Sequence, residues 1–361
     1  MRILFTVRGK NIDLLYENIC DADCPECFFK EEFEQKAEGK KETIIDLVKK
    51  LKNERVFFYP REPTTDMSLL DIYKPLKQTT ILTNGKQIVK NPNILERFKD
   101  AGIKEIKFTL FANAKEQKEI TKMKEKEYLG LRKIVKKASK DFKTEVFNIL
   151  YTKNIDSMES IAKISYDSGV DRITFLRLTP ISKEKGLPKE YFITSKTDGK
   201  KFVKNFQKLK EKYDKEELYI SSGMGFGPDF FTENTKKYLS GEGKETWASS
   251  NNLCPSINGN YLGISINSGK IYPCFKMMGE PQFQIGELTA NGDIEVNKTW
   301  IKSEDIKENI TGDCKKCDYL DDCLGGCRSV AYIFAKQRGE KNPLYAGMDI
   351  CRTQIRKEID I

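Results

Sequence analysis

The sequence predicts an α/β fold in which a partial (β/α)6 barrel precedes a smaller C-terminal domain of a different kind. In the first part, up to about residue 210, short apolar runs rich in β-branched and aromatic residues alternate with amphipathic, charged stretches. This alternation is typical of repeated β-α units around a parallel sheet. Beyond about residue 218, the chain is rich in glycine, asparagine and serine and holds seven of the ten cysteines. The change in composition indicates a second domain.

Six parallel strands are expected in the first part, because a helical stretch separates each apolar run from the next. The expected strands are Ile12–Tyr16, Val56–Tyr59, Thr79–Thr83, Ile103–Phe111, Val146–Tyr151 and Ile173–Leu178. The expected helices are Thr43–Leu51, Leu69–Leu76, Ile94–Lys99, Glu116–Ser139, Ile155–Ser168 and Lys201–Lys212. The run Ile3–Val7 is expected to form a hairpin with the first strand. Six units make an open barrel of the TIM type, whose chemistry should lie at the carboxyl ends of the strands.

Composition and charge along the chain indicate its domain limits, its location and the partners to expect. We place the barrel at residues 1–217, a connecting segment at 218–253 and the C-terminal domain at 254–361. The sequence has no apolar run long enough for a signal peptide or a membrane span, so we expect a cytoplasmic protein with no membrane partner. The formal net charge is +9, but lysines alternate with acidic residues along the helical stretches. This pattern indicates solvated helix faces rather than a nucleic-acid-binding surface.

Ten cysteines and no histidine narrow the chemistry further. In a reducing cytoplasm, thiolate-bound metal explains so many clustered cysteines better than disulfides do. Without an imidazole, Ser-His-Asp and Cys-His catalysis are excluded, as are histidine-bound zinc, haem and Rieske sites. All-thiolate metal chemistry remains.

The first cysteine group, Cys20, Cys24 and Cys27, directly follows an expected strand and therefore lies at its carboxyl end. Three thiolates within eight residues can bind three irons of a [4Fe–4S] cube and leave the fourth iron open for chemistry. A zinc knuckle or three incidental thiols are the alternatives for this motif alone. The C-x3-C-x2-C spacing, ended by Phe28, resembles the radical S-adenosylmethionine (SAM) superfamily. The resemblance implies that SAM chelates the open iron and yields a 5′-deoxyadenosyl radical, which makes these cysteines catalytic.

The resemblance continues at the ends of the following strands. Residues 59–63, Tyr-Pro-Arg-Glu-Pro, resemble the family's Gly-Gly-Glu-Pro stretch with both glycines replaced, and residues 83–85 match its Thr-Asn-Gly turn. The match implies that Glu62 binds the SAM ammonium, that Thr109 and Lys122 lie toward the SAM carboxylate, and that Arg177 points into the site. The cofactor-binding residues that it implies are Phe28, Glu62, Thr83, Asn84, Thr109, Lys122, Asn148, Arg177 and Leu178.

The cysteines of the C-terminal part resemble a second known pattern, that of SPASM domains. The members of this pattern are Cys254, Cys274, Cys314, Cys317, Cys323, Cys327 and Cys351. The resemblance assigns Cys314, Cys317, Cys323 and Cys351 to an outer auxiliary cluster, and it assigns Cys254, Cys274 and Cys327 to an inner one. Three [4Fe–4S] clusters are thus implied, with no fourth cysteine for the inner one. Two four-thiolate zinc sites are the alternative, although they need one more thiolate than these seven.

The glycines that precede Cys327 also fit a cluster site. Gly325 and Gly326 are expected to adopt positive φ, because a residue without a side chain lets the backbone approach a cluster closely.

The resemblance implies a radical SAM maturase that abstracts hydrogen from a peptide or small-protein residue and completes an oxidative modification. The product could be an unsaturation or a thioether, carbon–carbon or carbon–oxygen crosslink. A flavodoxin- or ferredoxin-type electron donor is implied, and leader recognition would come from the barrel, its loops or a separate leader-binding protein. Two alternatives stay open: oxidation of a small molecule or cofactor precursor, and an iron–sulfur regulatory or nucleic-acid-binding protein.

Overall fold

The structure is a computed structural model, and the description below covers only part of its residues. These residues are 10–27, 29, 41–51, 55–180, 186–213, 218–222, 256–289, 292–298, 300–317 and 320–348. The run Ile3–Val7, for which a hairpin is predicted, lies outside them.

The six predicted strands are present and lie in parallel order. They are β1 (Asn11–Tyr16), β2 (Arg55–Pro60), β3 (Thr80–Thr83), β4 (Glu105–Thr109), β5 (Lys143–Leu150) and β6 (Arg172–Arg177). Strand β1 pairs with β2, whereas β3 to β6 form a second parallel sheet, so the barrel is interrupted between β2 and β3. The α/β fold with a parallel sheet is therefore confirmed.

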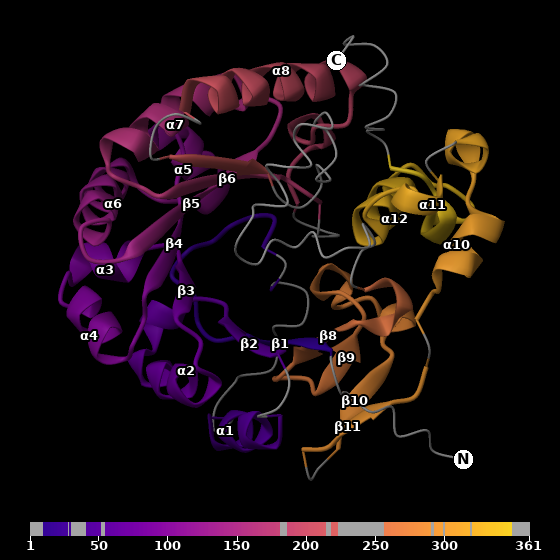
Figure 1. Ribbon diagram of the computed structural model, residues 1–361, viewed down its shortest axis with the longest axis horizontal. Helices are drawn as coiled ribbons and strands as arrows, with labels where there is room; N and C mark the ends of the chain where they lie inside the picture. Colours follow the sequence, from indigo (N-terminus) through magenta and orange to yellow (C-terminus); the bar gives the residue numbers. More distant parts are fainter. Residues whose placement is uncertain are drawn as a thin grey trace.

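The helices of this part lie outside the strands, as Figure 1 shows. They are α1 (Lys41–Lys50), α2 (Leu70–Leu76), α3 (Lys86–Lys90), α4 (Ile94–Asp100), α5 (Ala114–Thr121), α6 (Glu125–Ala138), α7 (Met158–Asp167) and α8 (Lys196–Tyr213). The short helix α3 was not predicted. The side of the strands that faces the helices is apolar, and the rings of Phe175 in β6 and Phe206 in α8 meet edge to face. The opposite side is more polar, with Lys107 Nζ 2.9 Å from Glu145 Oε2.

The single helix predicted over Glu116–Ser139 was wrong, because the chain breaks it at Lys122. This residue ends α5 in the left-handed region at φ 57°. The side chain of Thr121 donates to the Gln117 carbonyl (2.7 Å), and Met123 is buried before α6 begins. A local hydrogen bond and a buried methionine thus turn the chain where the charge pattern continues without a break.

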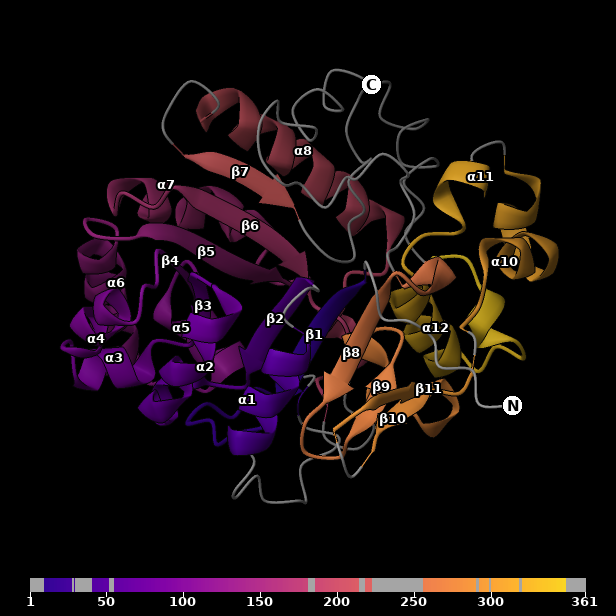
Figure 2. The ribbon, with the colours of Figure 1, turned by 60° about the horizontal axis from the view of Figure 1, so that its bottom comes forward.

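Strands from later in the chain extend both sheets. Strand β7 (Tyr219–Ser222) pairs in parallel with β6, and β8 (Tyr261–Ser265) pairs in parallel with β1. Beyond β8, the strands β9 (Lys270–Tyr272), β10 (Gly286–Leu288) and β11 (Ile294–Val296) continue in antiparallel order. Figure 2 shows this part beside β1. The predicted connecting segment and C-terminal domain therefore each contribute a strand to the barrel sheets, and the exact domain limits stay a prediction.

The described part of the C-terminal region holds three α-helices, and the last of them packs near the carboxyl end of β6. They are α10 (Ser303–Asn309), α11 (Leu320–Cys323) and α12 (Arg328–Gln337). The ring of Phe334 in α12 meets the ring of Phe192 edge to face, and the Arg177 guanidinium lies 4.6 Å above the Phe334 ring. This contact brings the second half of the chain against the end of the barrel where the first cysteine group lies. No helix in the described part of the chain is long and apolar enough to cross a membrane.

Candidate iron–sulfur and SAM site

The loop that carries Cys20, Cys24 and Cys27 begins where β1 ends, and the end of β2 holds it in place. The Asn18 side chain donates to the Glu62 carbonyl (2.6 Å) and accepts from the Glu62 N–H (3.1 Å). Thr65 Oγ1 donates to the carbonyl of Ile19 (2.6 Å). These bonds fix the start of the cysteine loop against the segment that follows β2.

The Glu62 side chain links the segment after β2 to the end of β3. It is 1% exposed, and Oε1 accepts hydrogen bonds from the Thr64 N–H (3.1 Å), the Thr64 hydroxyl (2.5 Å) and the Thr83 hydroxyl (2.7 Å). Its Oε2 accepts from the Asn84 N–H (2.8 Å). Burial raises the pKa of Glu62, and these donors oppose the rise. Because its two oxygens accept from Thr64 after β2 and from Thr83 and Asn84 at the end of β3, this side chain holds the β2 and β3 ends together.

Asn84 links the turn after β3 to the cysteine loop. Its Nδ2 donates to Asp21 Oδ1 (3.0 Å) and lies 3.6 Å from Cys20 Sγ, within hydrogen-bond distance of sulfur. Asp21 also accepts from the Gln87 side chain at Oδ2 (2.7 Å), and its carbonyl accepts from Lys86 Nζ (2.7 Å). Helix α3 thus clamps the loop between Cys20 and Cys24. Sequence reasoning did not find Asp21, whose only signal is an acidic residue inside the cysteine motif.

The donor set of this loop fits an iron–sulfur cluster. The Cys20 thiol has its pKa raised to about 11, mainly by burial, and the charge of Glu62 adds to the rise. The Ala22 N–H donates to Cys20 Sγ (3.4 Å) and opposes it. Bound iron would favour the thiolate, since a metal's own charge dominates the local electrostatics. In the described part of the chain, no three acidic or cysteine side chains converge as ligands of one metal ion do, but thiolates on different irons of a cube need not.

The other predicted SAM contacts lie at or beyond the ends of β4 and β5. Thr109 is half-buried at the end of β4, and its carbonyl accepts from the Gln117 side chain (3.3 Å). Asn148 is buried and donates to the carbonyl of Leu110 (2.9 Å). Lys122 is exposed and donates to the carbonyl of Glu119 (3.2 Å) on its own helix. Its predicted role toward the SAM carboxylate stays a prediction.

The remaining predicted contacts lie at the end of β6 or outside the described residues. Arg177 is buried against Phe334, and the Leu178 N–H donates to the carbonyl of Leu150 (2.8 Å) in an apolar cluster. Phe28 lies outside the described residues. Roles toward SAM for these residues stay predictions.

Two of the three cysteines predicted for the inner cluster come together, although 52 residues separate them in the chain. Cys274 follows β9 and Cys327 begins α12. Their sulfurs lie 3.8 Å and 3.2 Å from the same atom, Ser329 Oγ. Sequence reasoning did not find Ser329. The third cysteine, Cys254, lies outside the described residues.

The loop before Cys327 has the predicted backbone. Gly325 and Gly326 have φ 68° and 87°, which confirms the expected positive φ. A Cβ atom at Gly326 would lie 2.3 Å from Met348 Sδ, and the Cys327 N–H donates to the same sulfur (3.2 Å). Glycine is therefore needed here for conformation and for space.

The cysteines predicted for the outer cluster are only partly within the described residues. Cys314 and Cys317 belong to one turn, in which the Cys317 N–H donates to the Cys314 carbonyl (3.2 Å). Cys323 ends α11, and its side chain and Cys351 are outside the described residues. The structure thus leaves the four-cysteine grouping as a prediction.

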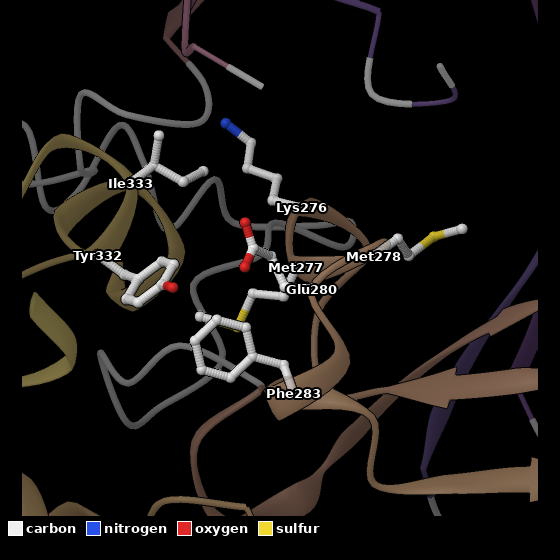
Figure 3. A pocket seen from close by; sticks show the side chains of 7 residues that line it. All are labelled: Lys276, Met277, Met278, Glu280, Phe283, Tyr332 and Ile333. Carbon is white, nitrogen blue, oxygen red and sulfur yellow. The ribbon is translucent and has the colours of Figure 1, made fainter. Parts of the chain in front are cut away.

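A buried lysine lies between the inner cysteines and the barrel. Lys276 Nζ donates to the Thr179 hydroxyl (3.0 Å) just after β6. Burial lowers the pKa of Lys276, whereas the Cys327 and Cys274 thiols oppose this and the nearby Arg177 charge adds to it. Figure 3 shows the small cavity beside it, in which the Lys276 side chain extends away from Glu280. Glu280 instead binds Lys336 Nζ with both oxygens (2.9 Å each).

Comparison with known proteins supports the fold. No protein-family model and no curated protein match the sequence. Among solved structures, Streptococcus suis SuiB bound to S-adenosylmethionine is 15% identical and has a TM-score of 0.65, with 95% of this chain and 77% of SuiB covered. Native anSMEcpe with bound AdoMet is 16% identical with a TM-score of 0.66, covering 96% and 95%. SuiB bound to precursor peptide SuiA is 18% identical with a TM-score of 0.63, covering 94% and 75%. At these identities the likeness shows the fold alone: this chain shares the α/β architecture of two proteins that were solved with S-adenosylmethionine bound.

Proposed function

We propose that this protein is a radical SAM maturase of the SPASM type that modifies a peptide or small protein oxidatively. The observation that carries the proposal is the Cys20 loop, which lies at the carboxyl end of β1 and is clamped by Glu62 and Asn84. Two solved structures of this fold, SuiB and anSMEcpe, hold bound S-adenosylmethionine, and they match this chain with TM-scores of 0.65 and 0.66. The alternative zinc knuckle would give no reason for Glu62 and Asn84 to gather the ends of three strands there.

The ten cysteines supply ligands for three [4Fe–4S] clusters in this proposal. Cys20, Cys24 and Cys27 hold the first, and the inner and outer auxiliary clusters take the C-terminal cysteines as predicted. When bound, the first cluster supplies the electron that cleaves SAM, and the resulting 5′-deoxyadenosyl radical abstracts a hydrogen atom from the substrate.

The chain's own residues fix and shield the first thiolates. Asn84 Nδ2 donates toward Cys20 Sγ and also to Asp21 Oδ1. Asp21 therefore fixes the orientation in which the amide meets the sulfur. Glu62 keeps the Asn84 backbone in place from the opposite side. Hydrogen bonds to cluster sulfurs influence the reduction potential, which makes these contacts part of the proposed chemistry.

A peptide substrate follows from the relatives of this fold. SuiB was solved with the precursor peptide SuiA, and anSMEcpe with the Cp18Cys peptide at 17% identity and a TM-score of 0.64. We propose the same substrate class here, with a thioether, carbon–carbon or carbon–oxygen crosslink as the product. A flavodoxin or ferredoxin would supply electrons in the cytoplasm, and a separate protein could present the leader.

SAM cleavage by the anaerobically reconstituted protein tests the proposal. Dithionite-reduced enzyme should convert SAM to 5′-deoxyadenosine. The variant Cys24→Ala should abolish this product, because it removes a ligand of the first cluster. The matched variant Cys317→Ala should keep it while it loses the modified substrate. Retained cleavage in Cys24→Ala, or none in the wild type, would overturn the assignment and favour a regulatory iron–sulfur protein.

The substrate class has its own test. Short reading frames next to the gene that encode repeated Cys, Asp or aromatic motifs would be co-expressed with the enzyme. The masses of their products would then be measured by mass spectrometry. We expect the loss of two hydrogen atoms in one of them. Turnover of a small molecule in place of any peptide would support the alternative oxidation of a cofactor precursor.

A further inference from the structure

A group of exposed lysines lies on the outer side of α6 and at the amino ends of β4 and β5. The α6 lysine group, as we call it, consists of Lys104, Lys133, Lys136, Lys137, Lys140 and Lys143. The four between positions 133 and 140 recur at helical spacing, so they lie on one face. The Lys143 N–H donates to the Lys104 carbonyl (2.9 Å), so these two lysines start neighbouring strands. The group thus covers the carboxyl end of α6 and the adjacent strand starts.

No member of this group forms an ion pair with a residue in the described part of the chain. The nearest acids in the sequence have other neighbours, since Asp141 lies 3.0 Å from Lys99 and Glu105 lies 4.0 Å from Lys107. Lysines on the next two helices are paired, as in Lys163–Asp167 (2.8 Å), Lys201–Asp156 (2.6 Å) and Lys212–Glu159 (2.7 Å). The absence of such partners distinguishes the α6 lysine group.

Helix stability does not explain the group. Lys136 and Lys137 lie in the last turn of α6, where a positive charge favours the helix end. Lys133 precedes that turn, and like charges four positions apart, such as those of Lys133 and Lys137, destabilise a helix. An anion bound along this face would remove the repulsion.

The other side chains of α6 indicate which class of anion fits. Leu129 is 50% exposed and lies one turn before Lys133 on the same face. Leu131 and Ile134 are buried in the core, so α6 has no free apolar face to enter a membrane surface. Its aromatic residue, Tyr128, is also buried, so α6 offers no ring for nucleic-acid bases to stack on. Carboxylates beside an apolar side chain, as in an acidic polypeptide, match both the lysines and Leu129.

The position of the group indicates which acidic polypeptide this is. Lys143 begins β5, whereas the Cys20 loop lies at the carboxyl end of β1, and the eight residues of β5 span about 25 Å. Figures 1 and 2 both show α6 on the side of the molecule opposite to α10, α11 and α12. An electron donor bound at α6 would therefore lie at least a strand length from the cysteines. A peptide can span that distance, because it is extended and continuous.

We propose that the α6 lysine group binds an acidic segment of the peptide substrate, while the residue to be modified reaches the carboxyl ends of the strands. The inference rests on the proposed function and deepens it, because it assigns substrate recognition to one surface of the barrel. An extended chain spans at most about 3.6 Å per residue, so about seven or more residues separate the acidic segment from the modified residue.

Fluorescence anisotropy with the reconstituted holoenzyme tests this recognition, with fluorescein-labelled poly-L-glutamate as the probe. The α6 variant combines Lys133→Gln, Lys136→Gln, Lys137→Gln and Lys140→Gln. The control variant removes the same charge from lysines that each have a carboxylate partner, and combines Lys49→Gln, Lys163→Gln, Lys201→Gln and Lys212→Gln. We expect the α6 variant to bind about tenfold more weakly at low salt and the control variant to bind as the wild type does. High salt should reduce the difference, because exposed charges are screened.

Two anions of other classes supply the comparison. Single-stranded DNA of the same charge and phosphatidylglycerol vesicles should bind more weakly than poly-L-glutamate. Tighter binding of either one that is lost in the α6 variant would assign the surface to a nucleic acid or a membrane and overturn the proposal.

Photo-crosslinking identifies the source of the acidic segment. The crosslinking amino acid p-benzoylphenylalanine replaces Leu129 in cells that co-express the short reading frames described above. We expect a crosslink to the peptide that also loses two hydrogen atoms. A crosslink only to a protein without that mass change, or no crosslink, would contradict a substrate at this surface.

SAM cleavage distinguishes failure of the inference from failure of the proposed function. The wild type and both combined variants should form 5′-deoxyadenosine at the same rate, because the group lies away from the Cys20 loop. Equal binding of poly-L-glutamate by the two variants, or no binding by the wild type, would overturn the inference alone. Absence of SAM cleavage in the wild type would overturn the proposed function instead.

Discussion

Cys20 and Cys327 are both half-buried at the end of a regular element, yet the groups around them differ in charge. Burial raises the pKa of the Cys20 thiol, the charge of Glu62 adds to the rise and that of Arg61 opposes it, and Asp21 lies next to Cys20 in the chain. Around Cys327 and Cys274 lie the Ser329 hydroxyl and Lys276, whose pKa is lowered by burial. The two groups of sulfurs therefore differ in their buried neighbours, a carboxylate at the first and a lysine and a serine at the second.

The largest effect is expected for the buried carboxylate of the first site. Glu62→Gln replaces one acceptor oxygen by an NH2 group, which must face the Thr64 and Thr83 hydroxyls or the Asn84 N–H. We expect a loss of about 3 kcal/mol in the free energy of unfolding, since at least one buried donor loses its acceptor. Anaerobic denaturant unfolding of the holoprotein measures this loss.

Glu127→Gln is the matched control for that change. Glu127 lies 3.6 Å from Lys86 at the same end of the barrel but is 25% exposed, so its loss should cost below about 1 kcal/mol. Equal effects of the two variants would contradict a special role for Glu62. The first site would then need no organising carboxylate.

A second buried carboxyl group, that of Asp13, lies near the second site. It is buried on β1 and accepts a hydrogen bond from Tyr261 (2.5 Å), whose hydroxyl also interacts with Cys274. Burial raises the pKa of Asp13 from 3.8 to about 7. The folded protein therefore holds this proton above the pH at which the unfolded chain releases it, and stability falls as pH rises from about 4 to about 7.

Asp13→Asn should remove this pH dependence. As pH rises, the free energy of unfolding of the variant relative to that of the wild type should increase by about 1.4 kcal/mol per pH unit, or about 2 kcal/mol from pH 5.5 to 7. Above pH 7 the difference should level off. Unfolding curves across this range measure the difference. A parallel pH dependence of the two proteins would show that Asp13 is already ionised, with a negative charge beside the second site.

The smallest difference between a variant and its control is expected at the glycine loop of the second site. Gly326→Ala places a Cβ atom 2.3 Å from Met348 Sδ in a left-handed conformation. Gly339→Ala is the control, since φ is 73° there and a Cβ would have nothing within 4 Å. Each should lose about 1 kcal/mol from backbone strain, and Gly326→Ala about 1 kcal/mol more from the contact with Met348. Thermal unfolding and iron content compare them, and equal losses would show that the loop adapts.

Local sequence determined much of this protein. The alternation of apolar runs and amphipathic stretches predicted six strands and their parallel order, because periodicity reflects which side of an element is buried. Cysteine spacing predicted the loop after β1, and Gly325 and Gly326 predicted a left-handed turn. Such features depend on neighbours within a few positions, so they can be predicted without knowing the fold. The break at Lys122 was missed because a single side-chain bond and one buried methionine decided it.

Only the tertiary structure decided which distant groups meet. Asn84 reaches Cys20 and Asp21 across more than sixty positions, Ser329 lies between Cys274 and Cys327, and β8 pairs with β1 across about 250. A serine after a cysteine and a lysine beside another are common in sequences, and nothing local marks them as partners. Their roles depend on burial and on the charges brought near them, which only the packed chain determines.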